Sequence, residues 1–292
     1  MQHLERYKKI FGEDFACPQK KMVWQLRTNE IKITANDLEK RLREKYGKLE
    51  KKDWANAFLV ESGENLANSL EHVLGLFFLQ NLSSMMPPLV LEPNENDRIL
   101  DMAASPGAKT TQIATMMENK GVIVANDIGN DRLKALRGNL QRCGVANAIV
   151  TETDGRFFKT DLAFDKILLD VPCTGTGTLS PRILKTTSEN TIRKFSNLQK
   201  QLLASATRHL KKDGILVYST CSLEPEENEE NVDFAIRKLG LVAEQLKLPE
   251  LKSRGVIVDW DGKKFDENVS NAARIIPDGI FEGFFVCKLR KY

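Results

Sequence analysis

From residue 97 onward, short apolar segments alternate with segments of helical spacing, and no other feature of the sequence constrains the fold as strongly. The apolar segments, which we expect to form strands, are 98–102, 121–126, 147–151, 165–170 and 214–220. The predicted helices begin near residue 109 and cover 131–142, 191–210 and 226–239. Such alternation is typical of a parallel sheet covered by helices on both faces. We therefore predict a doubly wound α/β fold that a strand at 281–289 closes.

The chain before residue 97 has a different pattern. The elements predicted there are a strand at 26–33, a helix at 37–46 capped by Asn36 or Asp37, and a helix at 73–82 that Pro87 and Pro88 stop. The polar segment 93–97 is the predicted linker. Because 292 residues are about twice the usual domain size, we predict a small α+β domain over 1–95 and a larger domain over 96–292.

Composition excludes several classes of protein. No run approaches the ~18 apolar residues that a membrane span needs, and the polar, charged start shows no secretory signal. The five cysteines form no CxxC pair and no Cys/His cluster, so we predict neither a disulfide framework nor a metal site. Free thiols without an export signal indicate a reducing cytoplasm.

Charge is distributed unevenly along the chain. Residues 1–60 hold 14 Lys and Arg against 9 Asp and Glu, a balance of +5, whereas the remaining residues sum to −2. A basic amino-terminal part suggests a polyanionic partner. On charge alone, a solvated helix face is the preferred interpretation.

Ligands of open α/β sheets bind beyond the carboxyl ends of the strands, so the residues that follow each predicted strand are the candidates for a site. The first loop, Asp101 to Thr110, is no Walker phosphate loop, because alanine replaces both glycines that such a loop needs. Its Pro106-Gly107 pair still lets the backbone approach a ligand closely. Asp127 ends the second strand 20 residues after Gly107, where doubly wound folds hold a ribose diol. A helix-capping role explains Asp127 equally well.

Two later strands each lead into a cysteine. The fourth runs into Asp170-Val-Pro-Cys173 and the fifth into Ser219-Thr-Cys221, whereas the third is followed by Asp154-Gly155, a sequence typical of a turn. If the strands are neighbours, the thiols should lie ~5–10 Å apart. A single buried cysteine usually belongs to the core. Two at adjacent strand ends, in loops rich in Gly, Thr and Ser, indicate thiol chemistry.

These segments, in this order, resemble the motifs of the Nol/Nop/Sun (Sun/Fmu) family of RNA cytosine-5 methyltransferases. Asp101 to Thr110 resembles the family's cofactor loop, Asp-x-x-Ala-Ala-Pro-Gly-Gly-Lys-Thr, and Asp170 to Gly175 resembles its Asp-Ala-Pro-Cys-Ser-Gly motif. Tyr218 to Ser222, followed by Glu224 to Asn228, resembles its second cysteine motif. Further similar signatures lie at Leu26 to Ile33, Gln80 to Ser84 and Arg274 to Phe285. The departures from the family pattern are Ser105, Ala108, Val171 and Thr174.

The resemblance implies a Rossmann-like methyltransferase sheet of class I behind a small RNA-recognition-like domain, with S-adenosylmethionine as the cofactor. It assigns the attack on cytosine carbon 6 to Cys221, the release step to Cys173, and a hydrogen bond near ring nitrogen 3 to Asp170. Covalent catalysis of this kind needs an activated thiolate. The cofactor-binding residues that it implies are Ala103, Ala104, Ser105, Pro106, Gly107, Ala108, Lys109, Asp127, Arg132, Asp154 and Asp170.

Alternatives remain at several positions. Arg132 is equally explained as an exposed helical arginine, and Lys109 could reach the base, a phosphate or only its own loop. Pro172-Cys173 with Glu230-Asn231-Val232 resembles DNA cytosine methyltransferases, in which the Pro-Cys thiol attacks. A non-catalytic RNA-binding assembly factor is a further alternative. We expect a monomer whose partner is RNA, with tRNA favoured over ribosomal RNA and no membrane involved.

Overall fold

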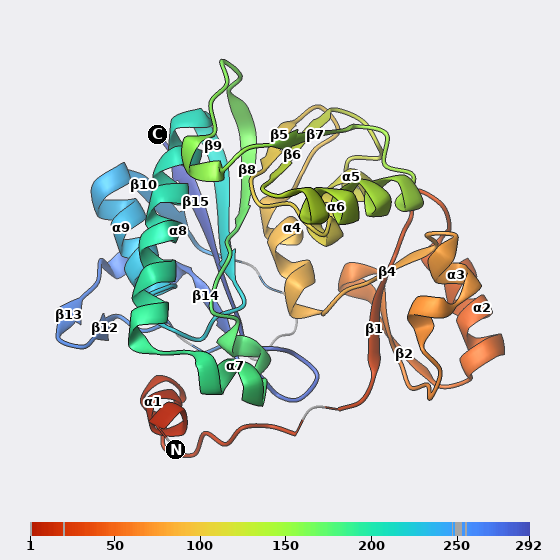
Figure 1. Ribbon diagram of the computed structural model, residues 1–292, viewed down its shortest axis with the longest axis horizontal. Helices are drawn as coiled ribbons and strands as arrows, with labels where there is room; N and C mark the ends of the chain where they lie inside the picture. Colours follow the sequence, from red (N-terminus) through yellow and green to blue (C-terminus); the bar gives the residue numbers. More distant parts are fainter. Residues whose placement is uncertain (1, 20, 247, 249–252, 255) are drawn as a thin grey trace.

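The computed structural model describes residues 2–19, 21–246, 248, 253–254 and 256–292. Its larger sheet holds, among the described residues, five parallel strands in the order β9-β8-β5-β6-β7 (Figure 1). These strands are β5 (Arg98–Asp101), β6 (Val122–Asp127), β7 (Ala148–Glu152), β8 (Phe164–Asp170) and β9 (Leu210–Thr220). Antiparallel strands continue the sheet beyond β9, namely β15 (Phe284–Lys291), β14 (Ala273–Ile275), β11 (Ser253–Arg254) and, on β15, β10 (Leu241–Glu244). The predicted doubly wound α/β fold is confirmed.

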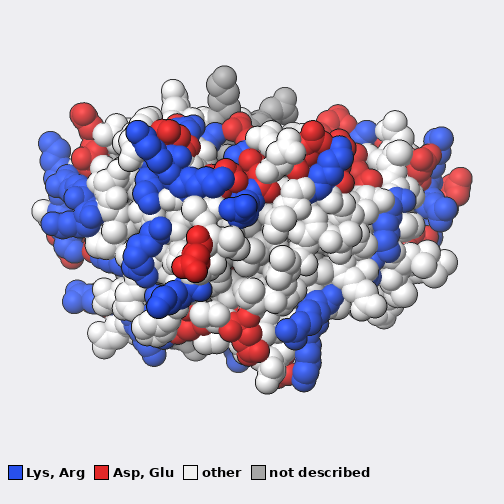
Figure 2. Space-filling view, turned by 90° about the horizontal axis from the view of Figure 1, so that it is seen from above, with Lys and Arg blue, Asp and Glu red and all other residues white. Residues whose placement is uncertain are grey.

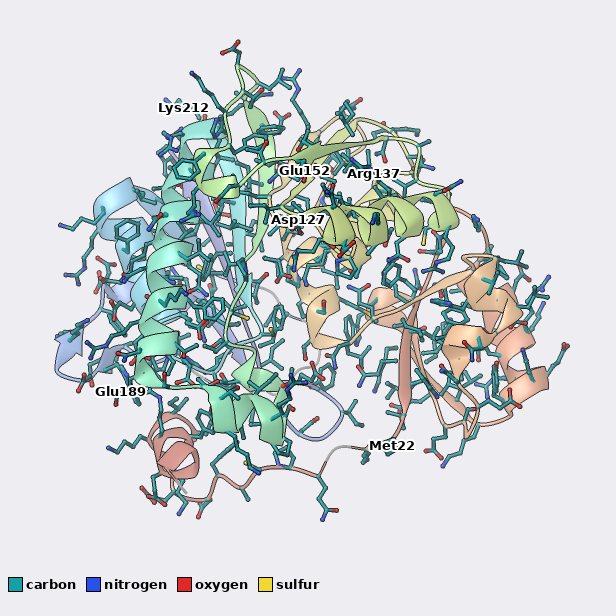
Figure 3. All side chains as sticks on the ribbon, in the orientation of Figure 1. Met22, Asp127, Arg137, Glu152, Glu189 and Lys212 are labelled. Atoms are coloured by element: carbon teal, nitrogen blue, oxygen red, sulfur yellow. The ribbon has the colours of Figure 1, made fainter. Side chains whose placement is uncertain are left out.

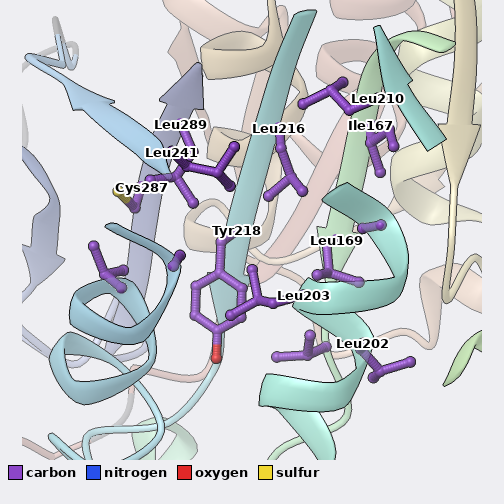
Figure 4. Close-up of a cluster of buried hydrophobic side chains, with 14 of the residues drawn as sticks. Ile167, Leu169, Leu202, Leu203, Leu210, Leu216, Tyr218, Leu241, Cys287 and Leu289 are labelled. Carbon is purple, nitrogen blue, oxygen red and sulfur yellow. The ribbon is translucent and has the colours of Figure 1, made fainter. Parts of the chain in front are cut away.

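Helices cover both faces of this sheet because each buries an apolar stripe against it. One face packs against α8 (Glu189–His209) and α9 (Glu229–Leu239), and its core includes Leu203 and Tyr218 (Figure 4). The other face packs against α4 (Met86–Leu91), α5 (Ala108–Met116) and α6 (Asn130–Cys143). The short α7 (Pro181–Thr186) and the hairpin of β12 (Asp259–Trp260) and β13 (Lys263–Lys264) lie outside these layers (Figure 1).

A second, smaller sheet is built by the amino-terminal part. Its antiparallel order is β2 (Leu49–Lys52), β3 (Ala57–Val60), β1 (Trp24–Thr28) and β4 (Phe77–Leu79). The helix α2 (Ala35–Tyr46) buries Leu38 and Leu42 in a core with Leu26, Phe58 and Phe77, and α3 (Leu70–Val73) precedes β4. The small α+β part that the resemblance implied is therefore present.

The first helix, α1 (Gln2–Phe11), lies apart from the small sheet, beside α7 and α8 (Figure 1). Its Tyr7, Ile10 and Phe11 form an apolar cluster with Leu223, close to the end of β9. Tyr7 donates a hydrogen bond to Glu224, and Arg6 forms an ion pair with the same carboxylate at 2.6 Å. The boundary at residue 95 stays a prediction, and α1 lies with the residues beyond that boundary.

One predicted helix before residue 97 was wrong, and so was the role given to the two prolines after it. The helix at 73–82 does not form, because Gly75 turns the chain at a φ of +71° and the apolar residues after it enter β4. A Cβ at Gly75 would lie 2.0 Å from the carbonyl oxygen of Arg142, so only glycine fits this close approach. Pro87 and Pro88 begin a helix, α4, instead of ending one, since proline is tolerated in the first helical turn.

Two predicted boundaries also need correction. The strand at 26–33 ends at Thr28, because the following residues form a turn in which the Lys32 amide donates to the Asn29 carbonyl. The cap of α2 is Thr34 and not Asn36 or Asp37, since its hydroxyl accepts a hydrogen bond from the Asp37 amide. In the part of the chain that the structure describes, no helix has both the length and the apolar character to cross a membrane.

Candidate active site

The carboxyl ends of the parallel strands bring the predicted site residues to one edge of the sheet. The chain order reverses beside β5, which pairs with β6 on one side and with β8 on the other. Ligands of doubly wound folds bind at such a switch point. Asp101 ends β5, Asp127 ends β6 and Asp170 ends β8, while Cys221 follows β9 directly. The sheet topology thus assembles in one place the residues that the sequence spreads over more than a hundred positions.

The loop from β5 to α5 lies between these strand ends. Its amide at Ala104 donates to the Asn126 carbonyl, and its amide at Ser105 donates to the Asp127 carboxylate at 2.8 Å. Gly107 has a φ of +102°, a conformation that a side chain would strain, and it opens α5. The loop is therefore held against β6 and exposes the start of α5 at the sheet edge.

Asp101 is a candidate residue that the sequence analysis passed over. Its side chain is 1% exposed, and its Oδ2 accepts a hydrogen bond of 2.7 Å from the Thr110 hydroxyl. Its Oδ1 is buried and has no hydrogen-bond partner among the described residues. Burial raises the pKa of this carboxyl to about 7. An unpaired, buried acceptor beside the loop can receive a donor group of a ligand, and only the three-dimensional structure shows that it is unpaired.

Asp127 lies at the end of β6, beside the start of α6 (Figure 3). Arg132 binds it with two hydrogen bonds, from Nε to Oδ1 at 2.7 Å and from Nη2 to Oδ2 at 2.9 Å. The arginine side chain is 54% exposed, whereas the carboxylate is almost fully buried. The structure thus brings Arg132 to Asp127, while its part in cofactor binding stays a prediction.

Asp154 follows β7 and caps a short turn of helix at Gly155 to Phe157. Its carboxylate accepts hydrogen bonds from the amide and the guanidinium of Arg156, the closest at 2.6 Å. These hydrogen bonds hold the pKa of Asp154 below its usual value. Asp154 is therefore a charged acceptor at the third strand end, and Arg156 is a partner that the sequence analysis did not name.

Lys109 and Asp170 form an ion pair beside the start of α5. The lysine Nζ lies 2.6 Å from Asp170 Oδ2 and also donates to the Ser84 hydroxyl at 2.8 Å. The other carboxylate oxygen of Asp170 accepts a hydrogen bond of 2.7 Å from Ser219. Lys109 is thus oriented by its neighbours, and its ammonium lies 5.6 Å from the centre of the Phe284 ring. The pair offers a donor and an acceptor in one partly enclosed place.

The two thiols lie closer together than the strand spacing predicted. Cys173 Sγ and Cys221 Sγ are 3.0 Å apart, and both cysteines are free and partly exposed. The loops converge because the Gly177 amide donates to the Cys221 carbonyl at 2.9 Å. The hydrogen bond with Cys221, followed by burial, raises the pKa of Cys173 well above its usual value. Two thiols at this distance do not ionise together, so the pair can present one thiolate and one thiol.

This arrangement supports nucleophilic chemistry. No group of three or more His, Cys, Asp and Glu side chains that could hold a metal ion exists among the described residues.

A model of the family described as 16S rRNA methyltransferase RsmB/F matches residues 88–290. The chain belongs to this family.

Similar proteins agree with the RsmB/F assignment. The chain is 41% identical to the tRNA (cytosine(49)-C(5))-methyltransferase of Pyrococcus abyssi, over 99% of this chain and 95% of that protein. It is 39% identical to the ribosomal RNA small subunit methyltransferase F of Vibrio atlanticus, over 94% of this chain but only 59% of that protein. The crystal structure of a methyltransferase homolog from Pyrococcus horikoshii superposes with a TM-score of 0.86 at 36% identity, over 100% of this chain and 95% of that one.

The resemblance to the Nol/Nop/Sun family is thus confirmed, and with it the enzyme class, an RNA cytosine-5 methyltransferase that uses S-adenosylmethionine. The strand ends of this RsmB/F chain fit that cofactor. Asp101 with its unpaired Oδ1, Asp127 and Asp154 offer carboxylate acceptors of the kind that ammonium, hydroxyl and amino groups require.

Proposed function

We propose that the chain forms 5-methylcytosine in tRNA through a covalent bond between Cys221 and carbon 6 of the cytosine. The observation that carries the proposal is the thiol pair, 3.0 Å apart at the ends of neighbouring strands and in loops that follow Asp170 and Thr220. Carbon 5 of cytosine is too poor a nucleophile to accept a methyl group unaided. Addition of a thiolate to carbon 6 makes the ring an enamine that is reactive at carbon 5.

Each residue of the edge has a proposed part in this reaction. Bound S-adenosylmethionine supplies the methyl group. The loop from Ala103 to Lys109 would surround the cofactor, Asp127 would accept hydrogen bonds from its ribose, and Asp154 would accept one from its adenine amino group. Asp170 would bind the cytosine edge near ring nitrogen 3, with Lys109 placed between this acid and Ser84. The cytosine must leave its stack to reach Cys221.

The coupling of the thiols supports the division of labour between them. While Cys221 is free, its hydrogen bond raises the pKa of Cys173, so Cys173 stays protonated and does not compete as a nucleophile. Once the Cys221 sulfur is bonded to carbon 6, that hydrogen bond no longer opposes ionisation of Cys173. Cys173 can then release its own proton to water, and the resulting thiolate takes the proton from carbon 5, directly or through water. Loss of this proton restores the double bond of the ring and returns Cys221 as a thiolate.

The experiment compares Cys221→Ala and Cys173→Ala in denaturing gels after incubation with substrate tRNA and S-adenosylmethionine. Cys221→Ala should neither methylate nor form an adduct, because the enamine never forms. Cys173→Ala should accumulate a denaturation-resistant protein–RNA complex, because methylation proceeds but release stalls. An adduct in Cys221→Ala alone would reverse the roles and favour the DNA-type arrangement. Activity without any adduct in both variants would contradict the covalent mechanism.

The choice of tRNA rests on overall length. The named tRNA relative matches this chain over nearly its whole length, whereas the chain covers 59% of the bacterial ribosomal relative and 34% of the human 28S rRNA (cytosine(4447)-C(5))-methyltransferase. Ribosomal RNA is the second candidate, because the chain is also 39% identical to the bacterial and 37% identical to the human ribosomal RNA methyltransferase. Mapping of 5-methylcytosine after incubation with unmodified tRNA and with ribosomal RNA fragments would separate the two substrates.

Reactive thiols also bear on the compartment. Cys173 and Cys221 must stay reduced to act, and all five cysteines are free. We therefore infer a reducing compartment, the cytoplasm, as the place of action. A monomeric state stays a prediction, which sedimentation would test.

A further inference from the structure

Glu227 is a fully buried carboxylate that lies between the two cysteine loops and has no part in the mechanism above. Its Oε2 accepts hydrogen bonds from the Thr174 amide at 3.1 Å and from Gln199 Nε2 at 2.8 Å. Its Oε1 accepts hydrogen bonds from the Thr174 hydroxyl at 2.5 Å and from the Ser222 hydroxyl at 2.7 Å. Four donors thus fill the acceptor sites of a single carboxylate.

Two of the three donor residues lie directly beside the thiols in the sequence. Thr174 follows Cys173, and Ser222 follows Cys221, so the carboxylate joins the residues next to both thiols. The two hydroxyls also lie 3.0 Å from each other. The third partner, Gln199, donates from α8 to the Pro172 carbonyl as well, which anchors the loop before Cys173. A buried carboxylate is costly unless donors surround it, so this site is built around the charge.

We propose that Glu227 is a positioning residue that holds the Cys173 and Cys221 loops together and thereby sets the distance between the two thiols. The inference rests on the proposed covalent mechanism and adds to it a residue that contacts neither cofactor nor base. The reacting sulfur must approach carbon 6 within a narrow range of distance and angle, and a misplacement of about 1 Å can cost about 100-fold in rate. Separation of the loops should therefore lower turnover without weakening substrate binding.

The negative charge of Glu227 also acts on one of the two thiols. Glu227, like Asp170, raises the pKa of Cys173, although the contact with Cys221 and burial contribute more. Both acids lie beside a thiol that must stay protonated during the attack. Of these two acids, Asp170 is paired with Lys109, whereas Glu227 is held by neutral donors.

Three variants separate position from charge. Glu227→Ala removes the carboxylate and with it all four hydrogen bonds. Thr174→Val removes one hydroxyl at nearly constant side-chain volume. Glu227→Gln can keep all four hydrogen bonds, because its amide oxygen can replace Oε2 while its NH2 group donates to hydroxyls that also accept. The control is Glu230→Gln in the first turn of α9, since that carboxylate pairs with Lys200 and Lys263 and, among the described residues, with none of the cysteine loops.

We expect kcat to fall by about 100-fold in Glu227→Ala and by about 10-fold in Thr174→Val, with KM for tRNA and for S-adenosylmethionine within about 2-fold of the wild type. Glu227→Gln should retain most of the wild-type kcat, and Glu230→Gln all of it. If Glu227→Ala does not fold, the comparison of kcat between Thr174→Val and Glu227→Gln still tests the positioning role. Wild-type kcat in Thr174→Val, or a loss in Glu227→Gln equal to that in Glu227→Ala, would overturn the positioning role.

The adduct of Cys173→Ala separates this inference from the function on which it rests. If that variant forms no adduct and the wild type methylates no RNA, the proposed function fails and the positioning role with it. If the adduct forms, its rate of appearance should fall about 10-fold when Thr174→Val is added to Cys173→Ala. An unchanged rate would leave the covalent mechanism intact and overturn only the role of Glu227.

Discussion

At the residue scale, three acids at the strand ends of the cofactor edge are already paired with a cation, whereas Asp101 is not. Asp127 holds Arg132, Asp154 holds Arg156, and Asp170 holds Lys109. The two arginines are partly exposed, whereas Lys109 is enclosed. Ion pairs with an exposed partner are weak, so cofactor hydroxyl and amino groups can replace the arginines at small cost. The enclosed pair of Lys109 and Asp170 should persist when ligands bind.

Asp127 provides the first prediction at this scale. Asp127→Ala should weaken S-adenosylmethionine binding by about 1–3 kcal/mol, because ribose hydroxyls lose their acceptor in a buried place. Isothermal titration calorimetry of the RNA-free enzyme measures the difference. Asp131→Ala, a change of an exposed acid four residues away, is the matched control and should leave the affinity unchanged. Equal affinities in both variants would remove Asp127 from the site.

Asp101 provides a prediction on pH. Burial raises its pKa in the folded state to about 7, whereas the unfolded chain releases the proton near 3.8. Between these values the folded state binds more protons, so its stability falls as pH rises and levels off above about 7. The full loss is of the order of ~4 kcal/mol.

Asp101→Asn cannot ionise and should escape this loss. Its free energy of unfolding relative to the wild type should therefore increase from pH 5 to pH 8, as measured by urea unfolding without cofactor. A difference that stays constant over this range would show that Asp101 does not titrate there.

At the element scale, the strand ends and the helix at 37–46 could be predicted from the sequence, whereas the conformation of 73–82 could not. Buried parallel strands are continuous apolar runs between helices, so β5, β6, β8 and β9 were located from their composition alone. By contrast, the run that enters β4 has helical spacing, and its strand conformation depends on pairing with β1 and on the close approach at Gly75. Tertiary contacts decide such a segment, and a single sequence does not contain them in readable form.

The same limit applies within the site. Asp127, Asp170 and both thiols follow strands, so the rule on strand ends located them. Asp101 and Glu227 were passed over, because their roles depend on burial and on partners that lie far away in the sequence. The short distance between the thiols was missed for a similar reason, since it follows from hydrogen bonds between two loops.

The contact between the small sheet and α5 provides an element-scale prediction. Arg27 of β1 is buried, donates to Thr111 of α5 at 2.9 Å and to Gln80 at 3.0 Å, and burial lowers its pKa to about 10. Arg27→Met should lower the free energy of unfolding by about 1–3 kcal/mol, because buried acceptors lose their donor. Arg41→Met on the exposed face of α2 should change it by less than about 0.5 kcal/mol. Urea titrations of both variants test this, and equal midpoints would contradict the structural role.

At the scale of the whole molecule, basic and acidic side chains are mixed on the surface. Figure 2 shows this mixture on the face seen from above. The basic cluster of α2 and β2, which includes Lys48, Lys51 and Lys52, is also paired with acids. Lys48 pairs with Glu61, Lys51 with Asp53, and Lys52 with Glu50. Such exposed pairs contribute little, so the lysines can exchange their carboxylate partners for RNA phosphates.

The prediction at this scale concerns RNA affinity. Affinity should fall steeply with salt, by about one unit of log–log slope for each phosphate contact, and neutralising Lys48, Lys51 and Lys52 should flatten that slope. The control neutralises Lys212 of β9, Lys238 of α9 and Lys264 of β13, elements on the opposite side of the molecule from α2 and β2, and should leave the slope unchanged (Figure 1). Filter binding at several salt concentrations gives both slopes. If the first set also has no effect, the cluster of α2 and β2 is only a solvated surface.

The contact of α1 with Glu224 determines when, during synthesis of the chain, α1 can pack against the rest of the protein. Arg6 lies 218 positions before its partner, and a ribosome that adds about 5–20 residues per second needs roughly 10–40 s to cover that distance. During this interval α1 has left the ribosome, yet its apolar side chains have no surface to cover them. The helix α1 is thus synthesised long before the residues on which it docks, and the loop behind Cys221 is closed only after residue 224 has been made. Catalytic competence should therefore appear late and abruptly in biosynthesis, and nascent chains are expected to offer α1 to chaperones until then.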